Sequence, residues 1–288
     1  TLNFAWADGD TAAKTDTVTI LSNAESTSDT QFRVSLGTPS GGANLGSPSA
    51  VTVTINNVHS SSSGNGYTPN KYVTTTAAGG GDGTLVNPWT MTEAMAQAVA
   101  GDIVRVSPGT YSINRTSTDN TPAFHPMNSG TLADPIIFYA EYPAATNSAN
   151  RSSLLHTGGI GYNTSGAGPV IGAISRDYIT WDGFLIDETQ FYTKSDNGPV
   201  YIGGCTGVQI INCDIRGQTT GIWSGDNHCG IRLGEAGFLT QDTTIKNNKI
   251  SNFYSFGTST HNGAGIMTYG CRGTLVEHNE VWNCGAGI

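Results

Sequence analysis

The sequence is poor in charged residues, and above all in basic ones. Lys and Arg account for 13 of its 288 residues and Asp and Glu for 22, so the formal net charge is −9. Nucleic-acid binding needs a dense Lys and Arg footprint, which argues against such a partner. The same balance repels a polyuronate and weakens unaided binding of that substrate. No stretch of 18 apolar residues occurs, so we expect no membrane span.

Helical patterning is absent across residues 160–288, and a repeated frame stands in its place. Short alternating runs such as Val200–Ile202 indicate strands. Successive repeats start 29, 31 and 35 residues apart. The anchors are Ile171, Val200, Ile231 and Ile266 in the first strand, Trp181, Ile210, Ile245 and Val276 in the second, and Ile186, Ile215, Ile250 and Val281 in the third. Three short strands per repeat predict the coils of a parallel β-helix, an all-β solenoid.

The frame also predicts what stacks between coils. Asn248 and Asn279 share one position, and Asn tolerates the αL conformation of a tight turn. We expect a stacked Asn turn there, with Asn212 and Asn247 beside it. The 35-residue coil has four extra residues before Ile245, so Gly234–Asp242 should form a protruding loop.

A short helix precedes the first coil. Thr90 and Glu93 form a capping box, and an apolar face follows from Met91 to Val99. Gly101 is expected to end the helix. Such a helix can plug the open apolar end of a β-helix.

These residues carry a resemblance. The strings D-G-T-x-x-N-P-W-T (82–90), A-x-A-G-D-I-V-x-V-x-P-G-T-Y (98–111) and G-T-L-A-D-P-I-I-F-Y-A (130–140) resemble the opening of the pectate-lyase-like right-handed parallel β-helix superfamily. The resemblance covers roughly residues 70–288. It implies a right-handed single-stranded β-helix that is secreted or at the cell surface. It also implies a polysaccharide lyase or glycoside hydrolase, if the chain is an enzyme, with Ca²⁺ as a cofactor by resemblance alone. No Lys or Arg matches a catalytic motif of the family.

Residues 1–58 differ in character. Alternating segments at Leu2–Trp6, Thr17–Leu21, Gln31–Leu36 and Val51–Ile55 predict half of a β-sandwich. The segment resembles the C-terminal half of a Calx-beta domain. Asp8 and Asp10 read as turn residues. A Ser/Gly linker at 59–69 then leads to the β-helix at 70–288, which the frame cuts off partway through a coil.

The cysteines show neither C-x-x-C nor His-rich zinc spacing. Cys205 and Cys271 share one slot but lie two coils apart, roughly 9–10 Å, which is too far for a disulfide. We predict free, buried thiols that act as small hydrophobic side chains. The five are Cys205, Cys213, Cys229, Cys271 and Cys284.

A first candidate site lies between the third strand of one coil and the first strand of the next. Stacking would gather four side chains as a catalytic cluster, namely Asp196, Asp226, His228 and His261. Carboxylates beside imidazoles suit general acid–base chemistry. An ordinary ladder of turn residues produces the same pattern, so both interpretations stay open.

A second candidate is the outer face of the first strand. Tyr201, Arg232 and Tyr269 are expected to face outward and to stack on sugar rings. Ordinary cross-strand pairing is the alternative.

The sequence therefore predicts a secreted or cell-surface β-helix protein that binds a polysaccharide or surface glycan, and that in one version depolymerises it. The alternatives are a non-catalytic structural or adhesive protein and a subunit of an extracellular assembly. Open strand edges at the last coil predict self-association in the assembly case.

Overall fold

The computed structural model divides the chain into two compact units, Thr1–Ser60 and Ser61–Ile288, and each is described by itself. Among the residues that the structure describes, no helix is long and apolar enough to cross a membrane. The described residues are 4–15, 30–42, 44, 46–55, 66–113, 121–142, 151–156, 169–188, 198–217, 229–234, 237–253 and 263–288.

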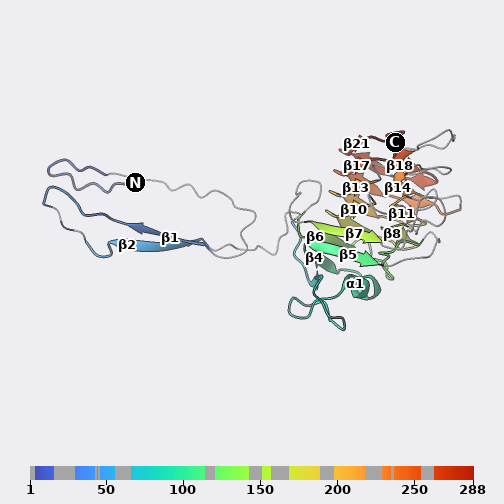
Figure 1. Cartoon of the computed structure of the whole chain (residues 1–288), viewed down its shortest axis with the longest axis horizontal. Coiled ribbons are helices and arrows are strands. Elements are labelled where there is room, and N and C mark those ends of the chain that lie inside the picture. The colour runs from blue at the N-terminus through green and yellow to red at the C-terminus, as the bar shows by residue number, and fades with distance from the viewer. Residues whose placement is uncertain are drawn as a thin grey trace. The chain divides into compact units, whose positions relative to one another are not determined.

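The second unit is a parallel β-helix, as the repeat predicts (Figure 1). Its seven-stranded sheet contains β3 (Lys71–Val73), β4 (Ile103–Val106), β6 (Ile136–Ala140), β9 (Ile179–Asp182), β12 (Gln209–Ile211), β16 (Thr244–Lys246) and β20 (Leu275–Glu277). The six-stranded sheet contains β5 (Gly109–Ile113), β7 (Ser152–His156), β10 (Leu185–Asp187), β13 (Asp214–Arg216), β17 (Lys249–Ser251) and β21 (Glu280–Trp282). The four-stranded sheet contains β8 (Ile171–Ile174), β11 (Val200–Gly203), β14 (Cys229–Leu233) and β18 (Ala264–Thr268).

The predicted register is confirmed at each set of anchors. Val200 pairs with Ile171 and Ile231, and Ile231 pairs with Ile266. The second-strand set, Trp181 to Val276, and the third-strand set, Ile186 to Val281, pair in the same way. Because side chains alternate along a strand, this register sends all the anchors to the same side of their sheets, where they form the core.

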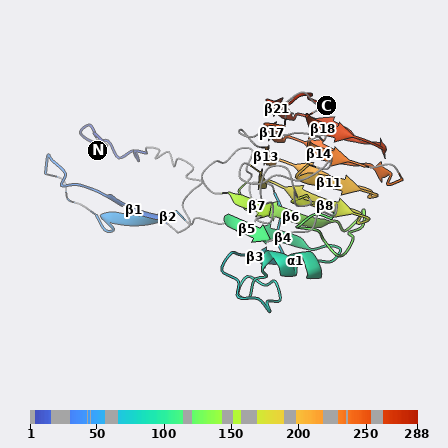
Figure 2. The ribbon, with the colours of Figure 1, turned by 45° about the vertical axis from the view of Figure 1, so that its right-hand side comes forward.

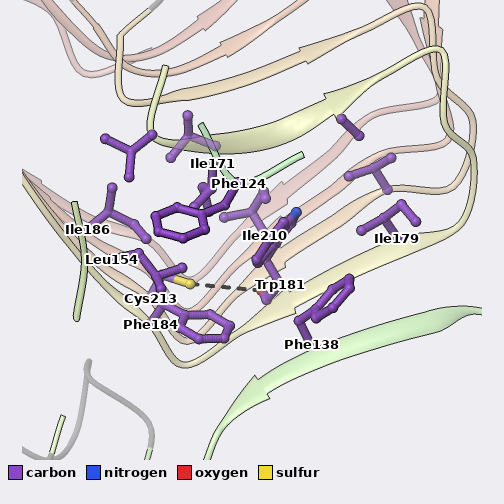
Figure 3. Packing of buried hydrophobic residues seen from close by; sticks show 14 of the residues in the cluster. Phe124, Phe138, Leu154, Ile171, Ile179, Trp181, Phe184, Ile186, Ile210 and Cys213 are labelled. Atoms are coloured by element: carbon purple, nitrogen blue, oxygen red, sulfur yellow. Dashed lines mark hydrogen bonds between the residues drawn. The ribbon is translucent and has the colours of Figure 1, made fainter. Parts of the chain in front are cut away.

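Aromatic rings fill the core of the early coils. The ring centroids of Phe138 and Trp181 lie 4.9 Å apart in a stacked arrangement, and Phe184 meets Trp181 edge-on at 5.8 Å (Figure 3). Later coils carry Ile210 and Ile245 at the Trp181 position. Each buried side chain of this size contributes roughly 1.5–3 kcal/mol by leaving water.

Helix α1 (Met91–Gln97) lies at the end of the stack beside β3 and β4 (Figure 2). The capping box is present, and Met91, Ala94 and Met95 are buried in the core. The predicted extent of the helix was wrong, since Val99 lies outside it and is exposed. The Asp102 carboxylate accepts the Val99 N–H at 2.9 Å, which ends the helix before Gly101.

Asparagines form a polar ladder inside the second corner of the later coils. The Asn248 side-chain oxygen accepts the Cys213 N–H at 2.9 Å, and the Asn279 oxygen accepts the Asn248 N–H at 3.0 Å. The Asn248 amide donates to Ile210 O at 2.9 Å. The predicted stacking is therefore confirmed, and each of these asparagines closes the corner of the coil before it.

The αL residues of this corner lie one position earlier than predicted. The residue directly after each strand has a positive φ, namely Asn212 (54°), Asn247 (56°) and His278 (55°). The chain bends there and leaves Asn248 pointing inward, where it is 1% exposed. The Asn247 side chain donates to that of Asn212 at 3.3 Å, so the bends stack as well.

The predicted loop at Gly234–Asp242 is shorter than expected. Thr240 and Gln241 form β15 (Thr240–Gln241), which pairs with β19 (Cys271–Arg272). Thr240 is fully buried, so the chain has rejoined the ladder by that residue. The described part that protrudes is 237–239.

In the first unit, β1 (Thr30–Ser35) and β2 (Ala50–Ile55) form an antiparallel hairpin. The predicted strand at Leu2–Trp6 was wrong for its described residues. Asp10 donates its N–H to Ala7 O and accepts the Ala12 N–H, so the chain turns there. Thr17–Leu21 lies outside the described residues.

The start of the second unit packs on the outside of the seven-stranded sheet. The ring of Tyr67 lies 5.1 Å from that of Tyr139, and its hydroxyl bonds to Asp182. Burial, together with the Asp182 charge, raises the pKa of Tyr67. Of the predicted linker 59–69, residues up to 65 lie outside the described part of the chain.

All five cysteines are free. Cys205, Cys213 and Cys229 are buried, as predicted, whereas Cys271 and Cys284 are half-buried. Those two lie in the last coil, which has neighbours on one side only. Burial raises the pKa of the Cys213 thiol to about 12 and that of Cys205 to about 11.

Replacing Asn248 by Ala leaves the Cys213 N–H and Ile210 O without partners in a buried corner. We expect a loss of about 3 kcal/mol in the free energy of unfolding, measured by denaturant titration. Asn247→Gly is the matched control, because Gly keeps the positive φ and Asn247 is exposed. This control should lower the free energy of unfolding by only a few tenths of the loss in Asn248→Ala. Equal losses in the two variants would contradict the role given to the ladder.

Stability should fall in alkali because the Cys213 thiol stays protonated in the folded state. Burial raises the folded pKa of this thiol above its ordinary value of 9.0, so the unfolded chain loses the proton first. This contribution is complete below about pH 9 and disappears as the pH rises toward 12. Melting temperatures of the parent and Cys213→Ala should converge between about pH 9 and 11. Parallel curves over that range would show that the thiol makes no such contribution.

Candidate functional site

The first strands of four coils form the four-stranded sheet. One column of stacked side chains lies on the outer face of this sheet. Tyr201 pairs with Gly172 and Arg232, and Arg232 pairs with Met267. This is the column that the frame predicts. Tyr269 follows two residues after Met267, just beyond β18.

Two members of the predicted sugar-binding set are not at the surface. Tyr201 is 3% exposed and Arg232 is 9% exposed. The Tyr201 hydroxyl lies back along its own strand, 2.7 Å from where a Cβ on Gly203 would be. Both side chains already make interactions within the chain. A sugar ring reaches neither of them in this arrangement, so their binding role stays a prediction.

Tyr269 is exposed, and two further exposed apolar side chains lie on the same corner, which the strand periodicity does not predict. Tyr269 is 56% exposed, and Phe238 and Leu239 are each 49% exposed. We call Phe238, Leu239 and Tyr269 the apolar ledge. Phe238 and Leu239 belong to the extra residues of the 35-residue coil. The available signal was an apolar pair within a segment predicted to protrude.

Backbone hydrogen bonds to the neighbouring coils hold the ledge in place. The Tyr269 N–H donates to Leu233 O at 2.7 Å. The Thr240 N–H, directly after Leu239, donates to Gly270 O at 3.1 Å. These bonds bring the two ledge segments together at the corner that leads from the four-stranded to the seven-stranded sheet.

Phe238 reaches back over the preceding coil. Gly204 has a φ of +64°, and a Cβ at that residue would lie 3.3 Å from Phe238 Cδ1 and 3.6 Å from Ser175 Oγ. The missing side chain at Gly204 thus lets the ring lie close to the backbone. The ledge residues therefore lie on two adjacent coils, and the Phe238 ring also covers the coil before its own.

The predicted catalytic residues Asp196, Asp226, His228 and His261 lie outside the described residues. The strands that flank their segments are stacked, since β10, β13 and β17 pair in order, as do β11, β14 and β18. The acid–base cluster and the ladder of turn residues therefore both remain predictions from the sequence.

Charged residues on the six-stranded sheet neutralise one another. Asp214, 4% exposed, accepts two hydrogen bonds from Arg216, at 3.1 and 2.6 Å, and lies 3.3 Å from Arg151. The Asp214 hydrogen bond raises the pKa of Arg216. The Asp214 carboxylate is therefore engaged by two arginines. Among the residues that the structure describes, no three His, Cys, Asp or Glu side chains lie together as a metal site requires.

Comparison with known proteins finds similarity to solved structures. No protein-family model and no curated protein matches the chain. Among solved structures the chain is similar to the pectate lyase Pel9A, with 18% identity and a TM-score of 0.44, over 70% of this chain and 46% of that one. It is also similar to a rhamnogalacturonan lyase, with 18% identity and a TM-score of 0.42, over 73% of this chain and 66% of that one. The chain spans less than two thirds of either structure.

The ledge side chains should add little to folding, because about half of each remains in water. We expect Phe238→Ser and Tyr269→Ser each to lower the free energy of unfolding by about 1 kcal/mol, since only half of each ring leaves water on folding. Ile231→Ala, which empties a fully buried position, should cost about 3 kcal/mol in the same assay. A large loss in either ledge variant would identify the ledge as part of the core.

Proposed function

We propose that this chain is a secreted or cell-surface β-helix protein that binds a polysaccharide through the apolar ledge. The observation that carries the proposal is the exposure of Phe238 and Tyr269 on adjacent coils of a rigid ladder. Aromatic rings offer a broad apolar face, and Tyr adds a hydroxyl, which together suit the apolar and polar parts of a sugar ring.

The rigidity of the platform supports this function. The backbone of Tyr269 and that of Thr240 are fixed by ladder hydrogen bonds, so little conformational freedom is lost when a ligand stacks on the ledge. The repeat also continues along the axis, so a long polymer lying on this flank meets successive coils. A polymer is therefore a better match than a compact small molecule.

Depolymerisation, by a lyase or a hydrolase, is the catalytic form of this proposal. It would fall to Asp196, Asp226, His228 and His261. Reducing ends and unsaturated products, followed over time with a polysaccharide panel, distinguish hydrolysis and elimination from binding alone. If Asp226→Asn and His261→Ala form product as fast as the parent, these residues are turn residues.

The non-catalytic alternatives concern surfaces other than the ledge. A structural or adhesive protein would bind no soluble glycan. A subunit of an assembly would associate through open strand edges, which light scattering over a range of concentrations detects. The likeness of the first unit to a Calx-beta domain stays a prediction. Ca²⁺ is implied by family resemblance alone, and calcium titration of the whole chain tests for it.

Truncating the ledge should weaken binding without unfolding the protein. With a glycan that binds the parent, we expect Tyr269→Ala and Phe238→Ala each to raise Kd about tenfold, about 1.4 kcal/mol, in calorimetric titration. Trp282→Ala is the matched control, since Trp282 is an aromatic residue, 43% exposed, on the six-stranded sheet. Binding that is lost equally in the control, or binding by no glycan at all, would refute the proposal.

A further inference from the structure

The described part of the corner that contains the apolar ledge carries as many acids as bases. Two arginines lie on the corner that contains the ledge, Arg176 after β8 and Arg272 in β19. Two aspartates lie on the same corner, Asp177 beside Arg176 and Asp242 after β15. The described part of this corner therefore has no excess of positive charge to attract an anionic polymer.

The guanidinium of Arg176 is already committed to the backbone. Its Nε donates to Met127 O at 2.7 Å, and its Nη1 donates to Ser175 O at 2.8 Å. The neighbouring Asp177 carboxylate accepts the Thr206 N–H at 2.7 Å. Both charges hold coils together. These bonds use two of the five N–H groups of Arg176 and fix its position, and the Asp177 carboxylate next to it in the chain offsets its charge.

The other basic residues near the ledge are no better placed. Arg272 donates to the Gln241 side chain at 3.0 Å, and Asp242 follows Gln241 on the preceding coil. Arg232 is 9% exposed and already makes interactions within the chain. The whole chain is acidic, with a net charge of −9, so an approaching polyanion meets repulsion at long range as well.

We infer that the ligand of the ledge is a neutral glycan. This rests on the proposed function and names its substrate class. The rings of Phe238 and Tyr269 stack on the apolar faces of uncharged sugars, whose hydroxyl groups need hydrogen-bonding partners but no cation. The Tyr269 hydroxyl is one such partner.

The test compares neutral and acidic oligosaccharides of equal length with the full chain. The neutral probes are β-linked gluco-, manno- and xylo-oligosaccharides, and the acidic probes are oligogalacturonate and oligomannuronate. We expect at least one neutral probe to bind with a Kd about tenfold or more below that of either uronate. That affinity should not change between roughly 0.05 and 0.5 M salt, because no ion pair forms. Each acidic titration is run with added Ca²⁺ and with chelator.

Two variants test whether the preference for neutral glycans arises at the ledge. Tyr269→Ala should weaken neutral binding about tenfold, whereas Arg272→Gln should leave it within twofold. Tighter binding of a uronate than of every neutral probe, with or without Ca²⁺, overturns the inference and leaves the proposed function standing. A loss of binding in Arg272→Gln that grows at low salt also overturns it. Failure of every neutral and acidic probe overturns the proposed function itself.

Discussion

Each coil of this β-helix depends on backbone hydrogen bonds to the coils beside it, and those bonds exist only in one register. A shift of one residue would turn every anchor of a strand from the core to the surface. The three sets of anchors therefore have to agree in every coil. Residues between the strands are free to vary in number as long as the next anchor returns to its place, and the 29-, 31- and 35-residue coils show this freedom.

The sequence is informative about the fold for the same reason. Ile231 and Ile266 stand where the register needs a buried aliphatic side chain, so the alternation along the chain identifies them directly. The role of Asn248 was harder to predict, because Asn suits both an αL bend and an inward hydrogen bond. Composition does not tell which of two neighbouring asparagines takes which role. The structure gives the bend to Asn247 and the inward bond to Asn248.

The candidate site was less predictable than the fold. Alternation shows which side of a strand Tyr201 and Arg232 occupy, but burial depends on what lies above the sheet, and periodicity carries no information on that. For the ledge, the informative residues lie outside the periodic pattern. Phe238 and Leu239 break the repeat, and the positions that break a repeat are those where the core places no demand on the side chain.

The asparagine ladder runs in one direction. Asn248 satisfies the N–H of Cys213 in the coil before it, and Asn279 then satisfies the N–H of Asn248. A corner is thus completed only when the following coil docks. The helix-capped end of the β-helix leaves the ribosome first during synthesis, so each coil is made before the coil that completes its corner. The last coil to emerge therefore keeps a backbone N–H and a backbone C=O without their asparagine partner until the next coil docks.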